Sequence, residues 1–245
     1  MLRTPATECL LQHIPSQLPM LREHSPSSPM APSSTPRWLG AAVALAVALP
    51  AQAGRPMSVD DAGVADAGQG QLEAWWEGAR GARGTSYLAP AYSPWQGMEL
   101  GAVLARDHGA RTTLHGLQAK WLWSPSRDEG CNAASSVGVV HTRHTAHSTL
   151  ALTLVGTCAT PWGALHANLG ALRMPERHWA PAWGFAVERA FGPVTVHAEA
   201  FGQRGSAPTF QTGARWEWAP QWQLDGSIGR QQGRTLLSAG IRRGF

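Results

Sequence analysis

The sequence predicts an all-β protein: an antiparallel up-and-down transmembrane β-barrel of about 12 strands, with ten or fourteen strands as the alternatives. Segments with alternating apolar and polar residues follow one another from residue 71 to the C-terminus. After the N-terminal region, no apolar run approaches the ~20 residues that a spanning helix needs. Tryptophans and arginines also fall at opposite ends of the expected strands, as in barrels with an interfacial aromatic girdle.

The composition narrows the class of protein. The 245 residues are 43% hydrophobic and only 15% charged, and they include 12 tryptophans. Such a chain is neither disordered nor a highly charged surface-helical protein. The net charge of +4 comes from scattered arginines without a basic stripe, so we expect no nucleic-acid partner. Nothing in the chain indicates a cofactor.

The N-terminal region has the pattern of a secretion signal. Residues 38–50 form an apolar run between Arg37 and the small-residue site Ala51-Gln52-Ala53. This run is too short to span a membrane as a helix, so we expect cleavage near Ala53. The Pro- and Ser-rich stretch before Met30 indicates a wrongly assigned start codon for residues 1–29, with an unusually long leader as the alternative.

The predicted organisation therefore has three parts. Residues 1–53 are leader and signal peptide, 54–70 a periplasmic N-terminal segment, and 71–245 the transmembrane barrel. The expected location is the outer membrane of a Gram-negative bacterium, with outer-membrane lipid as a partner.

Twelve alternating segments justify the barrel strand by strand. In chain order they cover residues 72–77, 87–91, 98–104, 117–123, 137–139, 150–154, 165–171, 183–188, 194–200, 210–218, 222–228 and 237–245. The last segment is the clearest, because its apolar residues alternate with small or polar ones up to Phe245. A terminal aromatic on such a strand resembles the assembly signal of outer-membrane barrels, so Phe245 predicts an interaction with the barrel-assembly machinery.

The connections sort by composition when both termini are placed on the periplasmic side. Proline marks the turns assigned to that side, at Pro94, Pro125, Pro161, Pro193 and Pro220. Arginines occupy the opposite loops, at Arg80, Arg83, Arg106, Arg111, Arg143, Arg173, Arg177, Arg204, Arg230 and Arg234. The predicted aromatic girdle at the periplasmic end consists of Trp95, Trp121, Trp123, Trp162, Trp216, Trp218 and Trp222. Tryptophans that close the end of a soluble sandwich are the alternative interpretation.

The opposite face of the strands carries polar residues of both signs. The candidates for lining the lumen are Glu73, Glu99, Gln118, Lys120, His166, Glu188, His197, Glu199, Arg215, Glu217, Asp225 and Arg242. In a barrel of this size such groups either line a narrow wet channel or pair across it and close it. The sequence leaves both alternatives open.

Two cysteines follow the leader. Cys131 and Cys158 fall on the same predicted rim, one hairpin apart, in an oxidising compartment. A disulfide between them is therefore a candidate. Two cysteines alone do not predict a zinc site.

The histidines offer weak alternatives. His141, His144 and His147 lie around one outer hairpin, but residues three apart on a strand point to opposite faces, so we expect no metal site. His147 and Ser148 suggest a lipid-modifying hydrolase, yet no orienting carboxylate is identifiable. We therefore expect no enzyme activity and no catalytic residues.

The start of the predicted mature chain resembles a known family. The residues that carry the resemblance are Arg55-Pro56-Met57-Ser58-Val59-Asp60-Asp61-Ala62 and Gly68-Gln69-Gly70-Gln71-Leu72-Glu73-Ala74-Trp75, with Met98-Glu99-Leu100 in a later strand. They are similar to the outer-membrane β-barrel family named for the MetA pathway of phenol degradation. Met57 departs from that pattern, in which an aliphatic residue is common. The resemblance implies a barrel that passes aromatic or other small hydrophobic compounds.

The acidic pair Asp60 and Asp61 precedes the first strand, and we expect it to remain solvated, with entry into the periplasmic mouth as the alternative. The function predicted from these observations is a passive channel or uptake protein whose permeant is a small molecule. A non-conducting structural or adhesive barrel is the second interpretation. A soluble, lipocalin-like periplasmic binder is the third, and it would place its large apolar residues inside.

Overall fold

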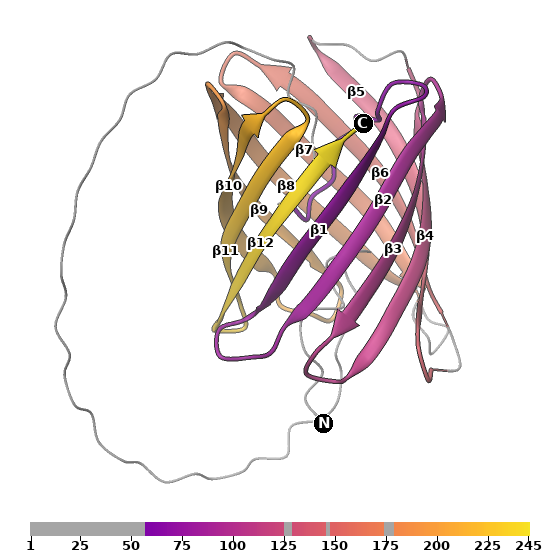
Figure 1. Ribbon diagram of the computed structural model, residues 1–245, viewed down its shortest axis with the longest axis vertical. Coiled ribbons are helices and arrows are strands. Elements are labelled where there is room, and N and C mark those ends of the chain that lie inside the picture. Colours follow the sequence, from indigo (N-terminus) through magenta and orange to yellow (C-terminus); the bar gives the residue numbers. More distant parts are fainter. Residues whose placement is uncertain (1–56, 125–128, 146–147, 174–178) are drawn as a thin grey trace, which may run out of the picture.

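The computed structural model describes residues 57–124, 129–145, 148–173 and 179–245. The predicted signal peptide and its cleavage site lie outside these residues. Twelve strands form within them (Figure 1): β1 Gly70–Ala79, β2 Thr85–Trp95, β3 Met98–Asp107, β4 Thr112–Leu122, β5 Cys131–Thr142, β6 Thr149–Thr160, β7 Gly163–Arg173, β8 Trp179–Phe191, β9 Val194–Gln203, β10 Thr209–Ala219, β11 Trp222–Gln231 and β12 Arg234–Gly244.

The strands form a closed antiparallel meander. Each strand pairs with its neighbours in sequence, and β1 pairs with β12 to close the ring. The closing register runs from Gln71 opposite Gly244 to Ala79 opposite Leu236. The predicted fold class and the strand number of twelve are thus confirmed within the described residues. No helix in this part of the chain is long and apolar enough to cross a membrane.

Alternation along each strand separates an apolar exterior from a polar interior. On β4, Leu117 is 66% exposed on the outside, whereas Lys120 is 5% exposed and points inward. The same contrast recurs around the ring, with exposed leucines, valines and phenylalanines on nearly every strand. A soluble lipocalin-like binder would bury these residues, so their exposure argues against that alternative.

The two rims of the barrel differ in composition. The rim near the C-terminus, at the top of Figure 1, carries the seven tryptophans of the predicted girdle. Six of them are exposed: Trp95, Trp121, Trp123, Trp162, Trp216 and Trp218. Trp222 is half-buried beside Trp218, with 6.0 Å between their ring centroids. The arginine-rich turns lie at the opposite rim, as the sorting by connection predicts.

Strand β5 is longer than the sequence pattern indicates. Alternation predicts only residues 137–139, but the strand spans Cys131–Thr142. Its inward positions hold small or weakly polar residues, including Ala134, Ser136 and Gly138, which pair with β4 in a continuous register. Small residues on both faces reduce the contrast on which the periodicity depends.

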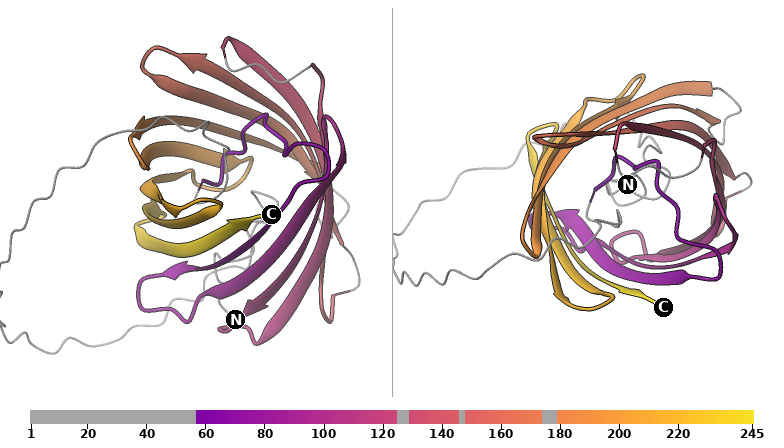
Figure 2. Two further views of the ribbon diagram at one scale, coloured as in Figure 1. Left: turned by 45° about the horizontal axis from the view of Figure 1, so that its top comes forward. Right: turned by 90° about the horizontal axis from the view of Figure 1, so that it is seen from above.

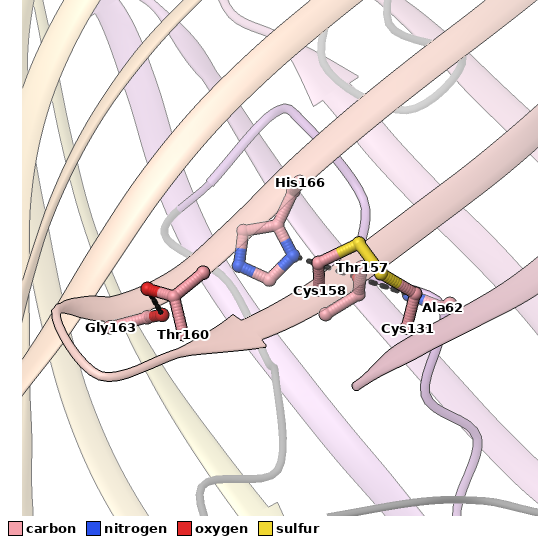
Figure 3. Close-up of a disulfide and its surroundings, with 7 residues drawn as sticks. All are labelled: Ala62, Cys131, Thr157, Cys158, Thr160, Gly163 and His166. Carbon is pink, nitrogen blue, oxygen red and sulfur yellow. Dashed lines mark hydrogen bonds between the residues drawn. A yellow bond between two sulfur atoms is a disulfide. The ribbon is translucent and has the colours of Figure 1, made fainter. Parts of the chain in front are cut away.

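The structure joins Cys131 and Cys158 through a disulfide at the open end of the β5–β6 hairpin (Figure 3). The two residues are direct register partners, and their Cα atoms lie 4.0 Å apart. Thr157, next to Cys158, points inward, because its hydroxyl accepts a hydrogen bond from the N–H of Ala62 inside the barrel. Because neighbouring side chains on a strand point to opposite faces, the disulfide lies on the exterior.

We predict that replacing Leu117 by Arg lowers the free energy of unfolding in a lipid bilayer by about 2–4 kcal/mol, because its charge would enter the middle of the apolar band. The matched control is Gln118→Arg, whose side chain faces the polar interior. The measurement is the urea concentration at which the folded band disappears from an unheated gel. Equal losses for both variants would contradict the assigned faces.

We also predict that the pair Cys131→Ser and Cys158→Ser lowers the free energy of unfolding by about 3 kcal/mol, through the entropy of the chain that the bond closes. The cysteines are 27 residues apart in sequence. Urea titration of the oxidised protein, the reduced protein and the double variant measures this effect. Reduction should destabilise the native protein and leave the double variant unchanged.

Candidate functional site: the polar interior and the segment that crosses it

From residue 57 the chain runs inside the ring of strands, and it reaches the rim through the exposed residues 66–69 before it enters β1 (Figure 2). Met57, Ser58, Val59, Asp61 and Ala62 are all buried. The expectation that the acidic pair remains solvated is therefore wrong: Asp61 is buried, and the side chain of Asp60, which is 32% exposed, binds Lys120. Main-chain groups of the segment bind polar side chains of the barrel wall, and those partners lie about a hundred residues later in the chain.

Glu199 on β9 is the first anchor. Its carboxylate accepts the N–H of Ser58 at 3.1 and 2.8 Å and the N–H of Val59 at 2.7 Å. Gln211 on β10 donates to the same carboxylate at 2.6 Å. Hydrogen bonds to a buried charged acceptor are stronger than neutral ones, so Glu199 holds the segment tightly at this point.

Asn168 on β7 is the second anchor. Its Oδ1 accepts the N–H of Asp60 at 2.7 Å, and its Nδ2 donates to the carbonyl oxygen of Asp60 at 2.8 Å. The side chain is 1% exposed, and its amide both accepts and donates a hydrogen bond. A residue of a paired β-strand binds its partner's main chain in the same way. This pairing satisfies the donor and the acceptor of one residue of the segment.

Thr157 and His166 form a third contact, seen in Figure 3. The Oγ1 of Thr157 accepts the N–H of Ala62 at 2.8 Å and lies 2.9 Å from Nδ1 of His166. Next to this contact, the side chain of Ala62 packs in an apolar cluster with Leu122, Ala134 and Val155.

Lys120 on β4 binds the segment from the other wall. Its Nζ lies 2.9 Å from Oδ1 of Asp60. Four strands separate β4 from β9 on one side of the ring and six on the other, so Lys120 and Glu199 belong to nearly opposite walls. The segment therefore spans the interior from wall to wall between residues 58 and 60.

Close packing supports these polar contacts. Met57 and Val59 form a buried cluster with Ala186 and Phe201. A Cβ added at Gly184 would lie 2.8 Å from Cγ2 of Val59. The wall thus has a hydrogen atom in place of a side chain where Val59 approaches it.

A second polar cluster lies on the wall itself. Nη2 of Arg215 is 2.8 Å from Oε2 of Glu188, and Nε2 of His166 is 3.6 Å from Oε1 of the same carboxylate. Arg215 is 2% exposed, and a charge this deeply buried requires such a partner. Thr157 connects this cluster to the segment through His166.

The structure places the predicted lumen residues as follows. Lys120 and Glu199 hold the segment, and His166, Glu188 and Arg215 form the wall cluster. Glu99 accepts a backbone hydrogen bond from Ala65 of the segment, and Arg242 donates to Gln71 at 2.7 Å. His197 is buried with Nε2 4.0 Å from Glu199. The register puts the remaining four on the inward face opposite polar or small partners: Glu73, Gln118, Glu217 and Asp225.

The sequence interpretation missed an apolar patch on the inward face. Trp75 and Tyr87 stack there with 4.5 Å between ring centroids and 2° between ring planes. They belong to a buried cluster with Val103, Leu114, Val140 and Leu172. The signal was present in β1, because Trp75 alternates in phase with Glu73 and Glu77.

Only His141 and His144 of the histidine trio lie within the described residues. His141 lies 3.3 Å from the hydroxyl of Ser148, whereas His147 is outside the described residues. In the described part of the chain, no three His, Cys, Asp or Glu side chains are grouped so that they could hold a metal ion.

We predict that Glu199→Gln raises the hydrogen-exchange rates of the Ser58 and Val59 amides about tenfold, because each loses a charged acceptor. Glu217→Gln is the control, since it neutralises an inward carboxylate on a neighbouring strand without touching these amides. Exchange followed by mass spectrometry of the peptide that contains residues 57–62 measures the effect. Equal rates in wild type and Glu199→Gln would disprove the anchor.

Solved structures similar to this chain are outer-membrane barrels. The KdgM porin in complex with disordered oligogalacturonate matches with a TM-score of 0.62 at 11% identity, over 71% of this chain and 99% of that one. The COG4313 outer membrane channel from Pseudomonas putida F1 has a TM-score of 0.58 at 10% identity, over 76% and 98%. The outer membrane protein Omp33 of Acinetobacter baumannii has a TM-score of 0.52 at 10% identity, over 72% and 98%. At these identities the likeness shows a shared fold.

No curated protein matches this sequence. One family model does, and it covers residues 41–236, which include the segment in the interior and nearly all of the barrel. The chain therefore belongs to the family described as uncharacterised conserved protein UCP029691.

Proposed function

We propose that this protein is a passive channel or uptake protein of the Gram-negative outer membrane for small solutes. The observation that carries the proposal is a closed barrel with an apolar exterior and a polar interior. A wall of this kind satisfies its backbone within the sheet and can be surrounded by lipid. Channels among the structures of similar fold support the same function.

The segment 57–69 restricts the path in this proposal. It crosses the interior between opposite walls, held by Glu199, Asn168 and Lys120. Passage of a solute then requires either a narrow route beside the segment or its release from these anchors. The same feature favours the second candidate function, a barrel that does not conduct.

The solute class follows from the inward apolar patch in this proposal. Trp75 and Tyr87 stack within a buried cluster on the inward face, beside aliphatic side chains. A small aromatic or hydrophobic compound that reached this cluster would meet an apolar environment that favours it. The resemblance of residues 55–75 to the family named for the MetA pathway supports the same class.

Export and assembly complete the proposal. The predicted leader is removed near Ala53, and β12 serves as the signal for the barrel-assembly machinery. Phe245 supports this role, because its ring is 60% exposed at the end of the closing strand. No enzyme activity and no cofactor form part of the proposal.

The test is single-channel recording in planar bilayers. We predict small current steps for wild type. The double variant Asn168→Ala with Glu199→Gln should have an open probability that is larger by about two orders of magnitude. The physical reason is the loss of several hydrogen bonds of about 1 kcal/mol or more each. Glu217→Gln is the control for the loss of an interior charge and should conduct as wild type does.

The alternatives predict other results. Heat-modifiable migration on gels, with no current from wild type or from the double variant, would establish the non-conducting barrel. Protein that stays in solution without detergent would contradict a membrane location altogether.

A further inference from the structure

The rim opposite the tryptophan girdle carries a high density of exposed positive charge. Its described arginines are all exposed: Arg80, Arg83, Arg106, Arg111, Arg143, Arg173, Arg204, Arg230 and Arg234. Of the described carboxylates at this end, Asp107 is buried and accepts the N–H groups of Gly109 and Ala110, and Glu77 faces inward, where it accepts the O–H of Tyr87. In the described part of this rim, the exposed side chains are thus predominantly cationic.

Three neighbouring strands concentrate this charge on the exterior. Arg106 on β3 is the register partner of Thr113 on β4, and the N–H of Arg143 donates to the carbonyl oxygen of Thr113 at 2.9 Å. Their buried neighbours Ala105 and Leu114 point inward, so Arg106 and Thr113 point outward. Arg106 and Arg143 thus lie on either side of Thr113. Their backbones are about two strand spacings apart, roughly 10 Å.

Two imidazoles lie one step further into the wall. His115 and His141 are register partners on the same outward face, with 5.3 Å between ring centroids. The step below them is apolar: Leu117 and Val139 are register partners and both are exposed. The exterior therefore passes from arginines through imidazoles to aliphatic side chains over a few residues.

We propose that Arg106, Arg143 and the His115–His141 pair bind the phosphorylated headgroup of an outer-leaflet glycolipid of the lipid A type. Guanidinium groups match phosphate geometry through paired N–H donors, and imidazole adds further donors. A lipid is the occupant, and not a free anion, because these groups face away from the lumen and border the apolar band that contacts acyl chains. The inference rests on the membrane-spanning barrel of the proposed function.

The experiment uses the full chain purified from bacterial membranes and exchanged into detergent without lipid. Native mass spectrometry measures binding of diphosphorylated lipid A, dephosphorylated lipid A and inorganic phosphate. The variants are Arg106→Gln with Arg143→Gln, and Arg143→Gln alone in case the pair fails to fold. The matched control is Arg189→Gln with Arg243→Gln, two exposed arginines that lie over Phe191 and Trp222 at the other rim.

We expect diphosphorylated lipid A to bind wild type and the control pair equally, and to bind the Arg106 and Arg143 pair about tenfold to a hundredfold more weakly. Dephosphorylated lipid A should bind every variant weakly. The inference is overturned if the two pairs lose binding equally, if neither does, or if inorganic phosphate at equal concentration displaces the lipid.

Migration on gels separates this inference from the proposed function. Each preparation is run with and without heating. A protein that migrates as a folded barrel but does not prefer the phosphorylated lipid overturns the site and leaves the channel proposal standing. A protein that stays soluble without detergent overturns both.

Discussion

Closure of the sheet between β1 and β12 is the constraint on which the rest of the structure depends. The pairing joins the first and last strands of the meander in a continuous register. Without it, two edges would present unpaired N–H and C=O groups, and an apolar exterior surrounded by lipid could not satisfy them. Closure fixes the number of strands, and with it the width of an interior that side chains alone do not fill.

The contents of the interior follow from that width. A chain segment that enters it outside any strand has no sheet partner, yet its main-chain groups still need hydrogen bonds. The wall supplies them from side chains: Glu199, Asn168 and Thr157 each accept from a different part of the segment. Polar inward residues thus do structural work in this half of the barrel, in addition to any contact with a solute.

Periodicity in the sequence predicted the walls well, because each strand contrasts lipid-facing with inward residues. The pattern predicted the twelve strands and which alternate residues of each strand face inward, Lys120 and Arg215 among them. It could not predict the position of Asp60, whose partners Lys120 and Asn168 lie on strands far along the chain. An acidic pair beside glycines and alanines has no local property that indicates burial. The stacking of Trp75 on Tyr87 escapes prediction because tryptophans on barrel strands are expected in the interfacial girdle and nothing local marks these two as inward partners.

The way in which the segment is held affects how its sequence can vary during evolution. Ser58, Val59, Asp60 and Ala62 are recognised through their main-chain N–H groups, which every amino acid except proline possesses. Side-chain identity is constrained at Val59, which approaches Gly184, at Asp60, which pairs with Lys120, and at Ala62, which is fully buried in an apolar cluster. Family members can therefore diverge within this segment while keeping its course, provided that the acceptors on β6, β7 and β9 are retained. The determinants of the segment's position are thus encoded mainly in the barrel and only to a small extent in the segment itself.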